Sequence, residues 1–176
     1  MFDSVLWRWC CLIAVALYWC SACDHGLDAG PSRAMGIAGR VTFTGEWPEN
    51  VGQVAVAVYR ETPQELADFF ALVGADTEVE LGAEVYDYFV PIEVEGEYQW
   101  VVVAWRLQDS FWDFRSLLGC YHAPGDTRPT VVAVRRGEVA GDVDIAIDFG
   151  ILQSENLPTL CVQSIPPELL EQGSGQ

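Results

Sequence analysis

The chain contains no lysine, and its 9 basic residues are all arginines. Against them stand 26 acidic residues, which give a net charge of -17 at pH 7. A charge of this sign repels the phosphates of nucleic acid and excludes nucleic acid as a partner. It also opposes adsorption to anionic lipid headgroups, so any attachment to a membrane must be covalent.

Histidine is scarce as well, since only His25 and His122 are present. His122 lies two residues after Cys120, and a Cys–His pair is the beginning of a nucleophile–base arrangement. No third orienting group is identifiable, so we predict that the chain is not an enzyme and keep a Cys–His enzyme as the last alternative. Cys120, His122 and Cys161 are too few for a closed zinc site. The sequence predicts no metal and no cofactor.

A run long enough to span a membrane is also missing. Residues Trp9 to Trp19 are apolar without a break, whereas a spanning helix needs about 20 apolar residues. The length is typical of the hydrophobic region of a signal peptide, and Arg8 precedes it. An uncleaved membrane anchor is less favoured, because a longer helix would bury Arg8 or reach Asp24.

The segment Cys20-Ser21-Ala22-Cys23 follows this run. It resembles the lipobox of bacterial lipoproteins, in which the cysteine after two small residues is acylated and becomes the new N-terminus. Cys20 departs from the pattern, because the family usually has leucine there. The resemblance implies a signal peptide over residues 1–22, lipidation at Cys23 and a lipid anchor to a membrane of the cell envelope. Ordinary cleavage after Ala22, which gives a secreted soluble protein, is the alternative.

Two of the 6 cysteines remain for the exported domain. Three leave with the signal peptide and a fourth carries the lipid: Cys10, Cys11, Cys20 and Cys23. In an exported protein, the remaining Cys120 and Cys161 most simply form one disulfide. Two buried thiols are the alternative.

The rest of the chain has the two-residue period of β-strands. Residues 23–35 are rich in glycine, proline and serine, and we expect a flexible tether there. Between Gly36 and Gly150, alternating apolar residues and turn signals predict about seven strands, which argues for an all-β fold, an antiparallel β-sandwich. A mostly irregular tail is expected over residues 151–176.

One segment departs from the strand pattern. Thr62-Pro63-Gln64-Glu65 has the form of a capping box and predicts a short inserted helix over residues 63–73. Its apolar stripe consists of Leu66, Phe69, Phe70 and Val73. We expect this stripe to pack on Ala55 and Ala57 of the preceding strand. In the alternative, Phe69 and Phe70 form an exposed ridge that binds a partner.

Two stretches carry a resemblance to a known family. Gly36–Val41 and Gly96–Val101 are similar to the first strand and the G-x-Y strand of the transthyretin-like family, the carboxypeptidase regulatory-like domains common in bacterial surface lipoproteins. The resemblance implies an Ig-like sandwich that performs scaffold or binding work rather than catalysis. The inserted helix is not part of the family's minimal pattern.

Acidic residues of the last predicted strand raise the question of a calcium site. Asp142, Asp144 and Asp148 share its outward face, and Asp126 lies in a turn. Calcium needs six to eight oxygens that converge, usually from loops. Alternating aspartates on a strand are more typical of a solvated face.

Aromatic residues provide the best candidate site. We expect five of them at one end of the sandwich: Trp47, Phe111, Trp112, Phe114 and Tyr121. Flat rings in this arrangement stack on sugars, although large aromatics are mostly buried and these can instead close the end of the sandwich. We therefore predict a lipid-anchored, non-catalytic envelope module that binds an envelope protein or a polysaccharide, or has a structural role. A carbohydrate-binding module is the alternative.

Overall fold

The computed structural model describes residues 34–112, 116–126, 128–152, 159–162 and 165–171. The predicted signal peptide, Cys23 and most of the predicted tether lie outside these residues. The described part contains ten strands: β1 (Gly36–Thr44), β2 (Val51–Tyr59), β3 (Gly74–Asp76), β4 (Val85–Pro91), β5 (Gly96–Tyr98), β6 (Trp100–Leu107), β7 (Leu117–Cys120), β8 (Val132–Val134), β9 (Val139–Ala140) and β10 (Ile145–Asp148).

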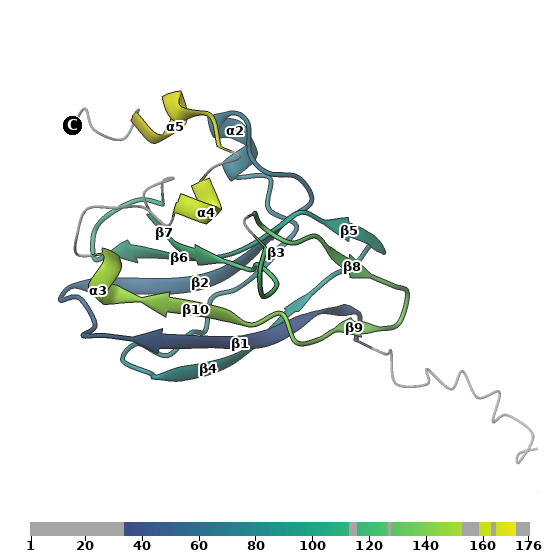
Figure 1. Cartoon of the computed structure of the whole chain (residues 1–176), viewed down its shortest axis with the longest axis horizontal. Helices are drawn as coiled ribbons and strands as arrows, with labels where there is room; N and C mark the ends of the chain where they lie inside the picture. The colour runs from purple at the N-terminus through teal and green to yellow at the C-terminus, as the bar shows by residue number, and fades with distance from the viewer. Residues whose placement is uncertain (1–33, 113–115, 127, 153–158, 163–164, 172–176) are drawn as a thin grey trace, which may run out of the picture. The chain divides into compact units, whose positions relative to one another are not determined.

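Most strands belong to two sheets that pack face to face (Figure 1). The first sheet has the order β10-β1-β4, with β9 also paired to β1, and the second has the order β3-β2-β6-β7. Strands β5 and β8 form a separate antiparallel ribbon. The chain is therefore an all-β sandwich, as the sequence predicts. The short strands β3, β5 and β9 are additional to the seven expected.

Most strand pairs are antiparallel, as predicted, and the exceptions involve β1. Both β9 and β10 pair with β1 in parallel, with Val41 opposite Ile145. A short hairpin makes neighbouring strands antiparallel, but β1 and β10 are separated by most of the domain, and no hairpin fixes their direction. Gly39 permits the close approach, because a Cβ there would lie 2.1 Å from the carbonyl oxygen of Val143.

The inner core lies between the two sheets and follows the predicted alternation. Its fully buried residues include Ile37 and Val41 of β1, and Val54, Val56 and Val58 of β2. Strand β10 adds Ile145 and Ile147, while Ala146 between them and Asp144 and Asp148 beside them are exposed. Strand β6 lies between β2 and β7 and is buried on both faces, as expected for a central strand.

The predicted helix over residues 63–73 is wrong in its extent, because α2 spans only Leu66–Phe69. Its N-cap is Glu65 rather than Thr62, and the Asp68 carboxylate accepts hydrogen bonds from the backbone N–H groups of Gln64 and Glu65. After α2 the chain joins the sheet edge, where the Val73 N–H donates to the Val58 carbonyl. Pairing with β2 thus replaces the last helical turns that the periodicity predicted.

The C-terminal segment returns over the second sheet. It contains the short helices α3 (Phe149–Leu152), α4 (Thr159–Val162) and α5 (Pro167–Glu171), where the sequence predicts a mostly irregular tail. Figure 1 shows α4 lying over β6 and β7. Across the described ranges, helices are all too short or too polar to span a bilayer.

Candidate functional site

The second sheet is apolar on its outer face as well as its inner face. Along β2 and β6, the side chains between the inward-facing valines are also buried, among them Tyr59, Trp100 and Val102. With residues from α2, β7 and the C-terminal segment they form a second group, the outer cluster: Ala57, Tyr59, Phe69, Trp100, Val102, Ala104, Leu117, Cys120, Cys161 and Ile165. The sandwich therefore has an apolar surface that a third layer must cover.

A disulfide fastens part of that third layer. Cys120 at the end of β7 is bonded to Cys161 of α4, with Cα atoms 5.6 Å apart, as the sequence predicts. Cys161 and Ile165 are buried in the outer cluster, and Leu169 and Leu170 of α5 pack against it. The C-terminal segment thus covers the half of the outer face that carries Trp100 and Leu117.

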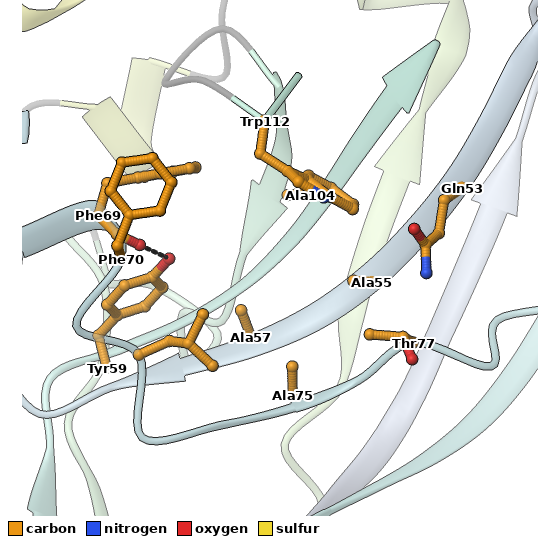
Figure 2. A pocket seen from close by; sticks show the side chains of 11 residues that line it. Gln53, Ala55, Ala57, Tyr59, Phe69, Phe70, Ala75, Thr77, Ala104 and Trp112 are labelled. Carbon is orange, nitrogen blue, oxygen red and sulfur yellow. Dashed lines mark hydrogen bonds between the residues drawn. The ribbon is translucent and has the colours of Figure 1, made fainter. Parts of the chain in front are cut away.

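The other half is left open as an apolar groove of about 170 Å³ (Figure 2). Four alanines line it, Ala55 and Ala57 from β2, Ala104 from β6 and Ala75 from β3, and the first three form its floor. Tyr59, Phe69 and Phe70 form one wall and Trp112 forms another, and Leu72 also lines the groove. Because alanine side chains are short, the floor lies well below the aromatic walls.

Hydrogen bonding and burial fix the first wall of the groove. The Tyr59 hydroxyl donates to the Phe69 carbonyl oxygen at 2.8 Å, which joins the sheet to α2. Burial raises the pKa of Tyr59 to about 12. Phe69 is buried, but Phe70, edge-on to it, is 66% exposed. The expectation that the whole stripe packs on β2 is therefore correct for Phe69 and wrong for Phe70.

Trp112 makes a cation–π contact with the Arg106 side chain. The Arg106 guanidinium carbon lies 5.9 Å from the centre of the Trp112 ring, within the range of a cation–π contact. Arg106 also donates from Nε to Gln53 Oε1 at 3.2 Å. These contacts place the indole as a wall over Ala104.

The loops that carry Trp47 and Trp112 lie at the same end of the sandwich, where Val51 is opposite Leu107, but the predicted aromatic rings do not pack together. Trp47 packs against the inner core with Phe43 and Phe149, and its indole N–H donates to the Ala83 carbonyl oxygen at 3.1 Å. Tyr121 also packs against the inner core, whereas Trp112 packs against the outer cluster. Phe111 is 92% exposed. Phe114 lies outside the described residues.

The acidic residues considered for calcium are dispersed. Asp142, Asp144 and Asp148 are exposed, and Asp144 accepts a hydrogen bond from the Arg40 backbone N–H at 2.8 Å. Asp126 accepts from the hydroxyl of Thr130. Over the described ranges, no three histidine, cysteine or carboxylate side chains gather as metal ligands would.

Cys120 is not available as the nucleophile of a Cys–His enzyme. A thiolate is the reactive form of cysteine, and the sulfur of Cys120 is bonded to Cys161 instead. His122 is an exposed residue just beyond β7.

Sequence reasoning missed most of the groove. It noted that Ala55 and Ala57 leave room above β2, and assigned that room to the helix. The signal that it lacked was Ala104, which continues the row of small side chains onto β6. Ala104 lies opposite Ala55 in the register of the two strands, and only this pairing reveals a shared floor.

The fold and this site define an all-β sandwich with a disulfide-fastened C-terminal cover and an open apolar groove beside it. Comparison with protein-family models, curated proteins and solved structures gives no significant match to the chain.

Proposed function

We propose that this chain is a lipid-anchored, non-catalytic binding module of the bacterial cell envelope. It is attached to a membrane through acylated Cys23 and binds an envelope protein in the apolar groove. The lipobox-like segment before Cys23 supports the anchor. The observation that carries the binding role is the groove itself, an open hollow of about 170 Å³ beside a fully packed inner core.

The rim of the groove supports a binding role. Two large apolar side chains that line the groove are exposed, Phe70 (66%) and Leu72 (43%), and so are Leu66 (48%) and Val73 (38%) in the same short stretch. Monomeric proteins rarely expose contiguous apolar side chains without a partner for them. The sandwich does not need these residues for its inner core, so we assign them to contact with another molecule.

The finer fold assignment, an Ig-like sandwich of the transthyretin-like family, belongs to the same proposal. Tyr98 is buried and its hydroxyl donates to the carbonyl oxygen of Val94, four residues upstream. The Arg60 side chain lies over the Tyr98 ring and donates to its hydroxyl. A tyrosine whose hydroxyl bonds back to upstream backbone is a feature of Ig-like sandwiches, and it supports the resemblance carried by Gly96 and Tyr98.

A polysaccharide partner has less support. A sugar ring in the groove would lose water from its hydroxyl groups and need polar partners to replace it. The side chains that line the groove are almost all apolar, and the amide oxygen of Gln53 already accepts from Arg106. An apolar side chain fits this lining better than a sugar.

Photo-crosslinking in the cell tests the binding role. A benzophenone residue in place of Leu72, at the rim of the groove, should give one discrete crosslinked product. The same residue in place of Ala146, exposed on the first sheet, is the control. Equal crosslinking at the two positions, or none at Leu72, would reject the groove as a binding site.

The anchor is tested separately by Cys23→Ser. We expect the wild-type chain to enter the detergent phase with an acyl mass at its N-terminus, and the variant to be released or left unprocessed. A wild-type chain that stays in the aqueous phase without an acyl group would disprove the anchor and leave the binding role standing.

A further inference from the structure

The apolar groove has a polar neighbour on the other side of Tyr59. This second hollow, of about 210 Å³, is lined by Arg60, Glu61, Gln64 and Asp68 among others, and Tyr59 lines both hollows. We call it the acidic hollow. Tyr59 is therefore a wall shared by the groove and the acidic hollow.

The charges of the acidic hollow do not cancel. The Arg60 guanidinium is directed to Tyr98, whose ring centre lies 5.3 Å away and whose hydroxyl accepts from it. The Asp68 carboxylate accepts two backbone N–H bonds at the start of α2. Glu61 forms no ion pair within the described part of the chain. Two carboxylates against one guanidinium leave this hollow negative, so it favours a cation.

The groove is suited to one large side chain. Its volume of about 170 Å³ compares with the ring-sized apolar cavities of about 150 Å³ that hold a benzene molecule. Phe69 and Phe70 form one wall, and Trp112 forms the other. Together the two walls can contact both sides of an inserted aromatic or branched aliphatic group.

The charge of the whole chain selects among possible occupants. At -17 and without lysine, the protein repels acidic partners, a second copy of itself and anionic lipid surfaces. A basic polypeptide is attracted over the same surface, and complementary charge accelerates its association. The groove supplies the apolar contact and the acidic hollow supplies the selection by charge.

We propose that the groove and the acidic hollow together recognise a polypeptide segment with a large apolar side chain and a basic side chain two residues apart. In an extended segment, side chains two residues apart lie on the same face at about 7 Å, which suits two hollows that share one wall. The proposal rests on the proposed function, since it names the chemistry of the partner that the groove binds.

The test uses the full chain in nanodiscs of zwitterionic lipid and a dye-labelled peptide with phenylalanine and arginine two residues apart in a glycine–serine background. Fluorescence anisotropy measures binding, and empty nanodiscs give the background. We expect saturable binding that weakens about tenfold or more when alanine replaces the phenylalanine. Glutamate in place of the arginine should weaken it several-fold, and high salt should remove that difference.

Variants of the protein locate the binding. Ala57→Leu fills the floor and should abolish binding, whereas Ala146→Leu, the same change on the first sheet, should leave it intact. Glu61→Arg should reverse the preference, so that the glutamate peptide binds better than the arginine peptide, and Glu97→Arg on β5 should not. Thermal melts confirm that each variant is folded.

Three outcomes would overturn the proposal. Binding that depends on phenylalanine but not on the charge of the peptide would retain an apolar partner and remove the charge selection. Concentration-dependent dimerisation that Ala57→Leu abolishes would identify a second copy as the occupant. Absence of binding by every peptide would reject the stated chemistry, while crosslinking at Leu72 would still decide the proposed function independently.

Discussion

The two faces of the second sheet bury similar residues but are covered in different ways. The inner face packs valines of β2 and β6 against the whole first sheet, and most of these side chains are fully buried. Among the described residues, the outer face is covered by α2, Trp112 and the short C-terminal helices, of which α4 is held by a disulfide. The inner layer is continuous, whereas the outer layer ends at the groove.

The inner face of the second sheet therefore serves stability, whereas its outer face offers a surface for recognition. Close packing across a continuous core leaves no space for a ligand and makes each large side chain important for folding. An incomplete layer contributes less to folding per residue, but it presents apolar surface on a rigid base. The sheet thus supports the fold through one face and offers a binding surface on the other.

The largest expected effect on stability comes from comparing a phenylalanine of the inner core with one at the groove. Phe149 is fully buried and packs on Phe43 and Trp47, while Phe70 at the groove is 66% exposed. Phe149→Ala should lower the free energy of unfolding by about 3–5 kcal/mol, and Phe70→Ala should change it by less than about 0.5 kcal/mol. Denaturant melts of both variants measure the difference. Similar losses would show that the groove wall is part of the core.

The next effect concerns the disulfide. Replacing Cys120 and Cys161 together with alanine should lower stability by about 2–4 kcal/mol. The loss should fall on the outer layer, because the disulfide holds α4 against β7. Hydrogen exchange should therefore accelerate in α4, α5 and β7 and stay slow in β1 and β2. Uniform acceleration across both sheets would mean that the two layers unfold as one unit.

The inner layer was largely predictable from the sequence. A two-residue period records which side of a strand faces the core, so Ile37, Val41, Ile145 and Ile147 were assigned correctly without any knowledge of the topology. The Cys120–Cys161 bond was also predictable, because these are the two cysteines that follow Cys23 in the sequence, and two cysteines allow one pairing.

The outer layer was not predictable, because it depends on pairings between distant segments. Leu66, Phe69 and Val73 have helical spacing, but α2 ends at Phe69 and the chain pairs with the edge of β2 from Val73 onward. Trp47 and Trp112 look alike in sequence, yet Trp47 packs against the inner core and Trp112 against the outer cluster. The floor of the groove appears only when β2 and β6 are placed in register.

Alkaline pH tests the contribution of the buried Tyr59 hydroxyl, which joins the second sheet to α2. Burial raises the pKa of Tyr59 to about 12, against about 10 for an exposed tyrosine. A raised pKa in the folded state gives a contribution that is complete below pH 10 and is lost as the pH rises through about 12. Unfolding free energies measured from pH 9 upward should therefore fall less steeply in Tyr59→Phe than in the wild type. Identical slopes would show that Tyr59 ionises in the folded protein as freely as in water.

Trp112→Ala should cause only a modest change in stability. Trp112 is only partly buried and its contacts are with the groove and the Arg106 side chain, so its removal should cost about 1 kcal/mol. Trp47→Ala is the matched control, because Trp47 contacts Phe43 and Phe149 and donates to a backbone carbonyl. That variant should lose about 3 kcal/mol.

The effects on peptide affinity should have the opposite order, with the larger loss in Trp112→Ala and the smaller in Trp47→Ala. Trp112→Ala removes one wall of the groove and should weaken the peptide with phenylalanine and arginine about tenfold, in line with the loss of an aromatic hot-spot residue. Trp47→Ala should bind that peptide with unchanged affinity at a temperature where it remains folded. A Trp112→Ala variant that loses several kcal/mol of stability would instead place this ring with the core residues. Both faces of the second sheet would then serve stability, and the groove would have no role in binding.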